Sequence, residues 1–164
     1  MNSTARNIGL ALGLTLAVGA ASVAYSQPSR ARAIDSRVAA MKTIQASMGA
    51  INAELKKPMP ETAAVQKAAK TLAQTANDVE NMFPAGSGAA VKPTRAKDEI
   101  WSNKAGFTAA LSSFQVQTSK LNQAALSGDL EAVRAQVPRT AATCGGCHTP
   151  FRGPAPAAPA ARPS

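Results

Sequence analysis

Five residues near the C-terminus, Cys144-Gly145-Gly146-Cys147-His148, constrain the fold of this chain more than any other stretch. On a helix, residues three and four positions apart share a face, so both thiols and the imidazole would project in the same direction. Two thiols at this spacing can reach the two vinyl groups on one edge of a porphyrin, and the imidazole that follows can bind the iron. The motif therefore predicts covalent attachment of one haem c through Cys144 and Cys147, with His148 as the proximal iron ligand.

Three other interpretations of this motif compete with haem attachment. A thioredoxin-like thiol pair normally opens a helix after a strand, and no strand-like run precedes Cys144. A zinc site needs four ligands, so carboxylates would have to complete a set in which Cys144, Cys147 and His148 are the only Cys and His residues of the chain. A pattern with three fixed positions also occurs by chance. We favour haem attachment because the start of the chain resembles an export signal.

Residues 1–26 are typical of a secretory signal peptide. Arg6 is the only charged residue in this segment, and residues 8–24 are a run of Ile, Leu, Val, Ala and Gly with two hydroxyl residues. Cleavage after the small residues would place the mature N-terminus between about Tyr25 and Pro28. An uncleaved membrane anchor is the alternative, because a spanning helix needs only about 20 residues, but the high Ala and Gly content favours cleavage. Haem is ligated to apo-cytochromes c outside the bacterial cytoplasm, so signal and motif together predict a periplasmic location.

The rest of the chain divides into one domain, residues 28–152, and a Pro- and Ala-rich segment, residues 153–164, that predicts a disordered tail. The domain is rich in Ala, Lys, Gln and Leu and shows no sustained alternation of apolar and polar residues. Apolar residues at three- and four-residue spacing predict helices at about residues 28–55, 61–83, 98–127 and 129–151. Such a set predicts an all-α fold, an antiparallel up-down four-helix bundle with a cofactor in its core.

Pro and Gly residues set the expected helix boundaries. Pro84 begins a loop that reaches to about residue 97, and Gly128 separates the third helix from the fourth. Pro138 lies inside the fourth helix and is expected to bend it just before the haem motif. In this register Cys144 and His148 fall on the apolar stripe of the fourth helix, so the motif is expected to face the core.

Four short motifs accompany this pattern: Arg37-x-x-x-Met41-Lys42 in the first helix, Glu99-Ile100-Trp101 opening the third, Gly128-Asp129-Leu130 opening the fourth, and Cys144-x-x-Cys147-His148-x-x-Phe151-Arg152. Together they resemble the class II c-type cytochromes, that is, cytochromes c′ and their low-spin relatives, over about residues 37–152. Class I cytochromes c carry the haem motif near the N-terminus instead. The resemblance implies a four-helix bundle with one covalently bound haem c and no enzymatic activity.

The resemblance also implies an identity for the distal iron ligand. High-spin, five-coordinate members of the family carry a non-ligating side chain four residues after the arginine of the first helix, whereas low-spin members carry a methionine that binds iron. Met41 occupies this position, so the resemblance implies that Met41 is the distal ligand and that Met48 lines the pocket. An adaptable core methionine is the alternative for Met41.

Three further residues receive roles from the resemblance. Arg37 and Arg152 match arginines near the haem propionates, where a guanidinium suits carboxylate geometry. Trp101 matches an aromatic residue that packs near the haem edge. A solvated surface charge is the alternative for each arginine, and ordinary core packing is the alternative for Trp101.

These expectations lead to three hypotheses about function. A Met/His-ligated iron has closed coordination and a raised reduction potential, which predicts a periplasmic one-electron carrier with low-spin haem. If Met41 does not coordinate, a five-coordinate protein that binds nitric oxide or carbon monoxide is the alternative. A haem-free binding bundle that happens to contain the motif is the third and weakest hypothesis.

The charge of the chain indicates its partners. Lys and Arg number 18 against 9 Asp and Glu, a formal net charge of +9. A basic carrier is steered toward redox partner proteins with an acidic docking face, and its association rate falls as salt rises. Nucleic acid is disfavoured because the basic residues are spread over the helices with few aromatic residues between them. A homodimer is possible, since class II relatives often pair through their first two helices, and membrane association is expected only with an uncleaved signal.

Overall fold

The computed structural model describes residues 18–155, with side chains from Ser29 onward. Its elements are α1 (Val18–Leu55), α2 (Thr62–Asp78), the 3-10 helix η1 (Val79–Met82), α3 (Glu99–Ser102), α4 (Lys104–Leu126) and α5 (Leu130–Phe151). Within this part of the chain there is no strand, although an isolated antiparallel bridge pairs Ala96 with Arg152. The predicted all-α fold is confirmed.

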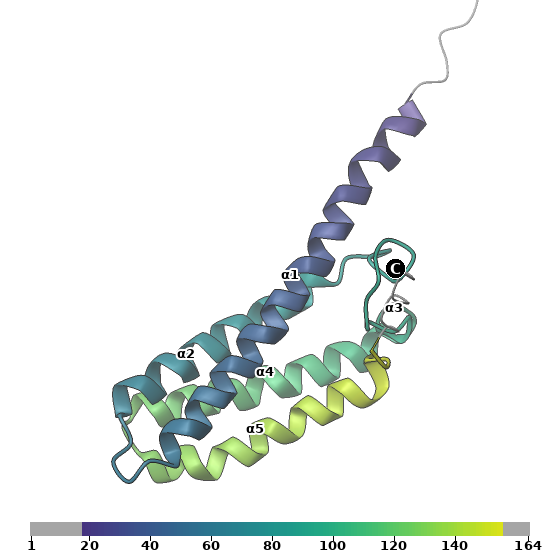
Figure 1. The fold of residues 1–164 in the computed structure, drawn as a ribbon. Coiled ribbons are helices and arrows are strands. Elements are labelled where there is room, and N and C mark those ends of the chain that lie inside the picture. Colours follow the sequence, from purple (N-terminus) through teal and green to yellow (C-terminus); the bar gives the residue numbers. More distant parts are fainter. Residues whose placement is uncertain (1–17, 156–164) are drawn as a thin grey trace, which may run out of the picture.

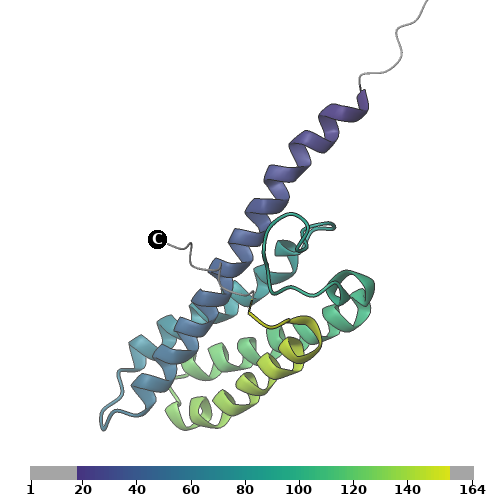
Figure 2. The same cartoon turned by 45° about the vertical axis from the view of Figure 1, so that its right-hand side comes forward.

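The four long helices form an antiparallel up-down bundle (Figure 1). Helix α1 packs against α2, α2 against α4, and α4 against α5, whereas α1 and α5 barely touch. The ring of helices is therefore open on one side, between the first helix and the last. Figures 1 and 2 both show α3 and the long loop before it at the same end of the bundle as the C-terminal end of α5. This end of the bundle is where the haem motif lies.

Helix α1 begins at Val18, well before the predicted start near residue 28, and continues through Pro28. The first turns of α1 extend beyond the other helices (Figure 1). Within residues 18–155, no helix is both long enough and apolar enough to cross a bilayer. The predictions for residues 1–17 and 156–164 lie outside the described part of the chain.

The predicted second and third helices are each divided in the structure. Helix α2 ends at Asp78 and tightens into η1. The third prediction corresponds to α3 and α4, which are separated at Asn103. The Asn103 side chain accepts a hydrogen bond from the backbone N–H of Gly106 at 3.1 Å, and so caps α4 as a new helix.

Helix α5 runs through Pro138, and its buried stripe differs from the predicted one. Gln136 and Thr140 are buried against α4, where Gln136 Nε2 donates to Gln117 Oε1 at 2.7 Å and Thr140 Oγ1 donates to the Gln117 carbonyl at 3.3 Å. The predicted stripe position Ala141 is exposed. These polar contacts fix the rotation of α5 against α4. The neighbouring face of α5, which carries the haem motif, is therefore turned toward the open side of the ring.

Candidate haem site

A cavity of about 820 Å³ lies between α1 and α5 at the open side of the ring. Its size falls in the range of about 300–1,000 Å³ that is usual for ligand pockets. Six of the seven predicted site residues line it: Arg37, Met41, Cys144, Cys147, His148 and Arg152. The structure thus brings together residues from the two ends of the domain, as the predicted site requires.

Cys144 and Cys147 are half-buried on the wall formed by α5. Burial raises the pKa of both thiols, and the charge of the Cys144 thiolate raises the pKa of Cys147 further. Cys144 Sγ donates to the Thr140 carbonyl at 4.0 Å, one turn earlier in the helix. Both sulfurs are free rather than paired in a disulfide. The geometry fits two thiols presented on one helix face to a common ligand.

His148 completes the motif on the same wall of the cavity. Burial lowers its pKa, and the positive charges of Arg152 and Arg95 lower it further. A neutral imidazole has a lone pair available for a metal. Within residues 18–155, no group of three or more His, Cys, Asp or Glu side chains could hold a metal ion. The cavity thus presents a half-buried imidazole, and its role as an iron ligand stays a prediction.

The opposite wall belongs to α1 and combines apolar side chains with the polar or charged side chains of Arg37, Lys42, Gln45 and Asn52. Met41 and Met48 both line the cavity, together with Val38 and Ile44. Met41 and Met48 are half-buried, whereas Val38 is 46% exposed. The thioether predicted as distal ligand thus shares the cavity with His148, while its coordination of iron stays a prediction.

Arg37 is buried at the end of this wall, with 3% of its surface exposed. Its Nη1 donates to Ser87 Oγ at 3.0 Å, and its Nη2 donates to the Ser87 carbonyl at 2.7 Å and to Thr94 Oγ1 at 3.0 Å. Nε is buried without a hydrogen-bond partner. Sequence reasoning anticipated Arg37 at the cavity but missed its bonds to the loop, because no local pattern links residues so far apart.

Basic residues rim the cavity. Lys42, Arg95 and Arg152 line it together with the buried Arg37, and no carboxylate does. Arg95 was not predicted as a site residue, since in the sequence it is one of many scattered basic residues. The rim therefore suits a ligand with negative groups at its edge.

Trp101 is not among the residues that line the cavity. Its indole Nε1 donates to the carbonyls of Phe83 and Pro84, at 3.2 Å each, and its ring lies 5.9 Å from the Arg37 guanidinium carbon. Trp101 thus supports the residues behind the cavity, and its predicted packing against haem stays untested.

All four phenylalanines of the chain, Phe83, Phe107, Phe114 and Phe151, line the cavity, and three of them form a chain of ring contacts. The rings of Phe83 and Phe107 lie 5.0 Å apart, and those of Phe107 and Phe151 lie 5.3 Å apart, both edge to face. Edge-to-face pairs at this separation are favourable. They join η1, α4 and the end of α5 into one apolar wall.

These features fit a covalently bound haem. Cys144 and Cys147 would form its attachment points and His148 would be its proximal ligand, while the phenylalanine rings and the α1 wall would enclose its apolar faces. The carboxylates of a haem would meet a rim that carries only positive charge, and the unpartnered Nε of Arg37 is a buried donor at that cavity. The residues present therefore match the cofactor that the motif predicts.

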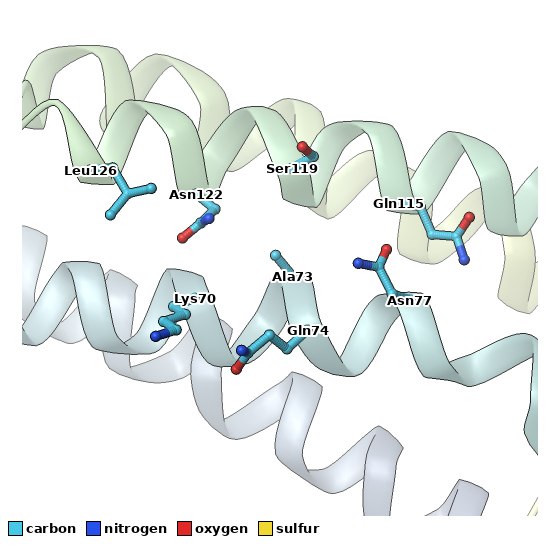
Figure 3. Close-up of a pocket in the computed structure, with 8 residues that line it drawn as sticks. All are labelled: Lys70, Ala73, Gln74, Asn77, Gln115, Ser119, Asn122 and Leu126. Carbon is cyan, nitrogen blue, oxygen red and sulfur yellow. The ribbon is translucent and has the colours of Figure 1, made fainter.

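A second, smaller hollow of about 400 Å³ lies between α2 and α4, away from the open side of the ring. Polar side chains border it, among them Asn77, Gln115 and Asn122, around a base formed by Ala73 (Figure 3). It contains no thiol, imidazole or acidic group. The chemistry of the haem motif is thus confined to the cavity between α1 and α5.

Taken together, the bundle and the cavity define a helical haem-c protein whose attachment motif lies in its last helix. The profile of the family Cytochrome C′ matches residues 32–152, and the chain belongs to this family. It is thus a haem c-type cytochrome, of a class whose members carry electrons or bind gases rather than act as typical enzymes. The predicted class II resemblance and covalent haem c are confirmed, while the low-spin subgroup is not.

Individual relatives span most of the chain. Cytochrome c-556 from Agrobacterium tumefaciens is 33% identical over 122 residues, which cover 73% of this chain and 95% of the relative. A solved cytochrome c′ with ligand-controlled dimer dissociation has a TM-score of 0.70 at 27% identity, covering 76% of this chain and 97% of that one. A nitric oxide complex of a variant cytochrome c prime from Alcaligenes xylosoxidans has a TM-score of 0.69 at 26% identity, covering 76% and 96%.

Proposed function

We propose that the cavity holds one haem c whose iron is five-coordinate through His148 and binds nitric oxide or carbon monoxide at its open side. The observation that carries this proposal is the shared cavity, which the motif residues of α5 line together with Val38 and Met41 of α1. The similar cytochrome c prime that was solved with nitric oxide supports it. The relatives thus favour the alternative hypothesis over the low-spin carrier that the sequence put first.

The side chains of the cavity contribute to this function in separate ways. Cys144 and Cys147 would hold the cofactor and His148 would bind its iron, since all three line the cavity from α5. A bound haem c supplies an iron that can exchange one electron and bind a small neutral gas. Val38 and Met41 give the α1 side of the cavity apolar surface on which such a gas could lie, next to the polar side chains of Lys42 and Gln45. The phenylalanine rings would add apolar surface around the cofactor.

A second candidate function is one-electron transfer with Met41 as a sixth ligand. The specific observation in its favour is that the Met41 thioether lines the same cavity as His148. Such ligation would stabilise the ferrous state and close the iron to gases. The choice between the two candidates therefore depends on one side chain.

An optical spectrum of the purified ferrous protein, before and after addition of carbon monoxide, tests the proposal. We expect a broad high-spin envelope that changes to a sharp low-spin spectrum when carbon monoxide binds. A sharp low-spin spectrum that carbon monoxide does not alter would favour the electron carrier instead. A preparation without a Soret band would contradict both and support the haem-free bundle.

The partner and location follow from the charge of the rim and from the export signal. Lys42, Arg95 and Arg152 at the mouth of the cavity suit a redox partner with an acidic docking face, which we place in the periplasm. Homodimer formation stays a prediction, supported by the similar cytochrome c′ whose dimer dissociates under ligand control.

A further inference from the structure

The loop formed by residues 84–97, here called the strap, connects the two walls of the cavity. It begins after η1 and ends just before α3. On one side the strap is bound to Arg37 of α1, and on the other it is bound to the end of α5. Because α1 and α5 barely touch each other, the strap links the helix that carries Met41 to the helix that carries His148.

The α1 side of this link is a buried guanidinium. Arg37 donates three hydrogen bonds to the strap, two to Ser87 and one to Thr94, with N···O distances of 2.7–3.0 Å. Ser87 is fully buried, at 0% exposure. The ring of Phe83, directly before the strap, lies 4.9 Å from the guanidinium carbon. Arg37 is thus enclosed by the strap and by the residue that leads into it.

The α5 side of the link is made by backbone pairing. The Gly153 N–H donates to the Arg95 carbonyl at 2.7 Å, and Arg95 Nε donates back to the Gly153 carbonyl at 2.8 Å. The Lys97 N–H donates to the Phe151 carbonyl at 3.1 Å. These residues directly follow the haem motif, so the C-terminal end of the strap is fastened next to His148.

Two further contacts hold the strap along α1. Lys92 pairs with Asp35, and Gly86 adopts a positive φ of 74° close to the Arg30 guanidinium, where a Cβ would lie 3.2 Å from its central carbon. The left-handed backbone at Gly86 is a conformation that side chains rarely adopt. The course of the strap is therefore specified by α1 at several points, with Arg37 as the buried one.

The position of Arg37 relative to Met41 gives this link a consequence for the iron site. The two residues are four positions apart on α1, so they lie one turn apart on the same face of the helix. Removing partners from a buried charge is strongly unfavourable, so α1 must stay where the strap can reach it. Releasing the guanidinium would remove this constraint on the part of α1 that carries Met41, although α1 stays packed against α2 and its C-terminal end accepts a hydrogen bond from Arg134 of α5.

We propose that Arg37 is a positioning residue that clamps the strap. It thereby fixes the distance between the two walls of the cavity, the α1 wall with Met41 and the α5 wall with His148. This spacing determines how readily a sixth ligand reaches the iron. The inference rests on the proposed function to the extent that it requires haem bound at His148. It differs from direct contact between Arg37 and the haem carboxylates, because here Arg37 acts through Ser87 and Thr94.

Two sets of variants distinguish a clamp that acts through the strap from direct contact between Arg37 and the haem. Arg37→Gln removes the guanidinium, whereas the double variant Ser87→Ala/Thr94→Val keeps it and removes its side-chain partners on the strap. Arg32→Gln on the exposed face of α1 is the matched charge control, and Thr43→Val is the matched hydroxyl control. Haem content and far-ultraviolet circular dichroism verify that each holoprotein is folded.

The first measurement is the affinity of each ferrous holoprotein for carbon monoxide. We expect Arg37→Gln and the double variant to raise it by roughly tenfold, the change equivalent to losing one hydrogen bond to a charged group, while both controls match wild type. The second measurement is hydrogen–deuterium exchange. Protection of residues 84–97 and of Gly153 should fall in both strap variants by about tenfold.

Three results would overturn the clamp. If only Arg37→Gln changes the affinity, Arg37 acts on the haem directly. If strap protection falls but affinity does not, the strap does not set the spacing. The double variant keeps the bond from Arg37 to the Ser87 carbonyl, so unchanged protection in both Arg37→Gln and the double variant means that the strap is not clamped. If Arg37→Gln accumulates without haem, the carbon monoxide affinity and strap protection of the double variant alone decide between the outcomes. If the wild-type protein binds no carbon monoxide, the proposed gas-binding function is contradicted but the clamp is not. Carbon monoxide binding that appears only in the strap variants would still support the clamp.

Discussion

Met41 and His148 line the same cavity, one from α1 and the other from α5, although these two helices barely touch. The gap between the walls is thus bounded by a thioether on one side and an imidazole on the other. The chemistry of a bound iron depends on whether the thioether reaches it.

Met41→Leu should leave the ferrous protein high-spin and change its affinity for carbon monoxide by less than about tenfold, because this swap conserves side-chain volume. Met48→Leu on the same wall is the control and should behave alike. Titration with carbon monoxide followed by absorbance gives both quantities. If Met41→Leu instead converts a sharp low-spin spectrum to high spin and creates a carbon monoxide site, Met41 is a ligand and electron transfer is the function.

Covalent attachment can be tested by mass spectrometry under denaturing conditions. The wild-type protein, produced with haem-attachment machinery, should carry the mass of one haem, and Cys144→Ser/Cys147→Ser should show the bare polypeptide. His148→Ala serves as the control, since it removes the iron ligand but neither thiol, and should retain covalent haem. A wild-type mass equal to the polypeptide alone would refute the site.

Charge at the rim of the cavity should control reactions with anionic partners. Lys42→Glu should slow oxidation of the reduced protein by ferricyanide, and the difference from wild type should shrink as ionic strength rises. Lys70→Glu makes the same change of net charge at the hollow between α2 and α4 (Figure 3) and should have a smaller effect. Equal slowing by both variants would show that net charge, rather than the rim, steers the reaction.

Phe107 joins two edge-to-face pairs and is 5% exposed. Phe107→Ala should lower the free energy of unfolding by about 3–5 kcal/mol, as is usual when a buried phenylalanine is truncated. Val116→Ala, at a position that is 50% exposed, should change it by no more than about 0.5 kcal/mol. Urea unfolding of the holoprotein measures both, and a small effect of Phe107→Ala would mean that the rings do not stabilise the fold.

Glu54 gives a pH-dependent contribution at the turn between α1 and α2. Its carboxylate accepts hydrogen bonds from Lys57 Nζ at 2.5 Å and from the backbone N–H of Glu61 at 3.1 Å, and both lower the pKa of Glu54. A lowered pKa in the folded state stabilises the protein above the unfolded-state pKa, near 4.3, and this contribution is lost as the pH falls through the folded-state pKa. Glu54→Gln should therefore be less stable than wild type at pH 7, with the difference closing in acid. Thermal melts of both proteins from pH 7 into acid measure this difference in stability. A difference that stays constant with pH would exclude linkage to the protonation of Glu54.

The apolar periodicity of the sequence predicted the four long helices because burial of one helix face repeats every three or four residues. It missed the division at Asn103 and the turn into η1, because local capping and tightening leave the apolar period almost unchanged. It also missed that Gln136 and Thr140 belong to the buried face of α5, since their polar contacts with Gln117 on α4 exist only after the helices pack.

The sequence by itself determined the chemistry of the cofactor, because thiol spacing and the adjacent imidazole of Cys144, Cys147 and His148 are local properties of one helix. It also determined the helical class, through the spacing of apolar residues. Only the tertiary structure decided which residues share the cavity and what Arg37 binds. Its partners Ser87 and Thr94 lie on a loop that has no periodic signal, and hydrogen bonds between residues far apart in the chain are set by how the whole bundle closes.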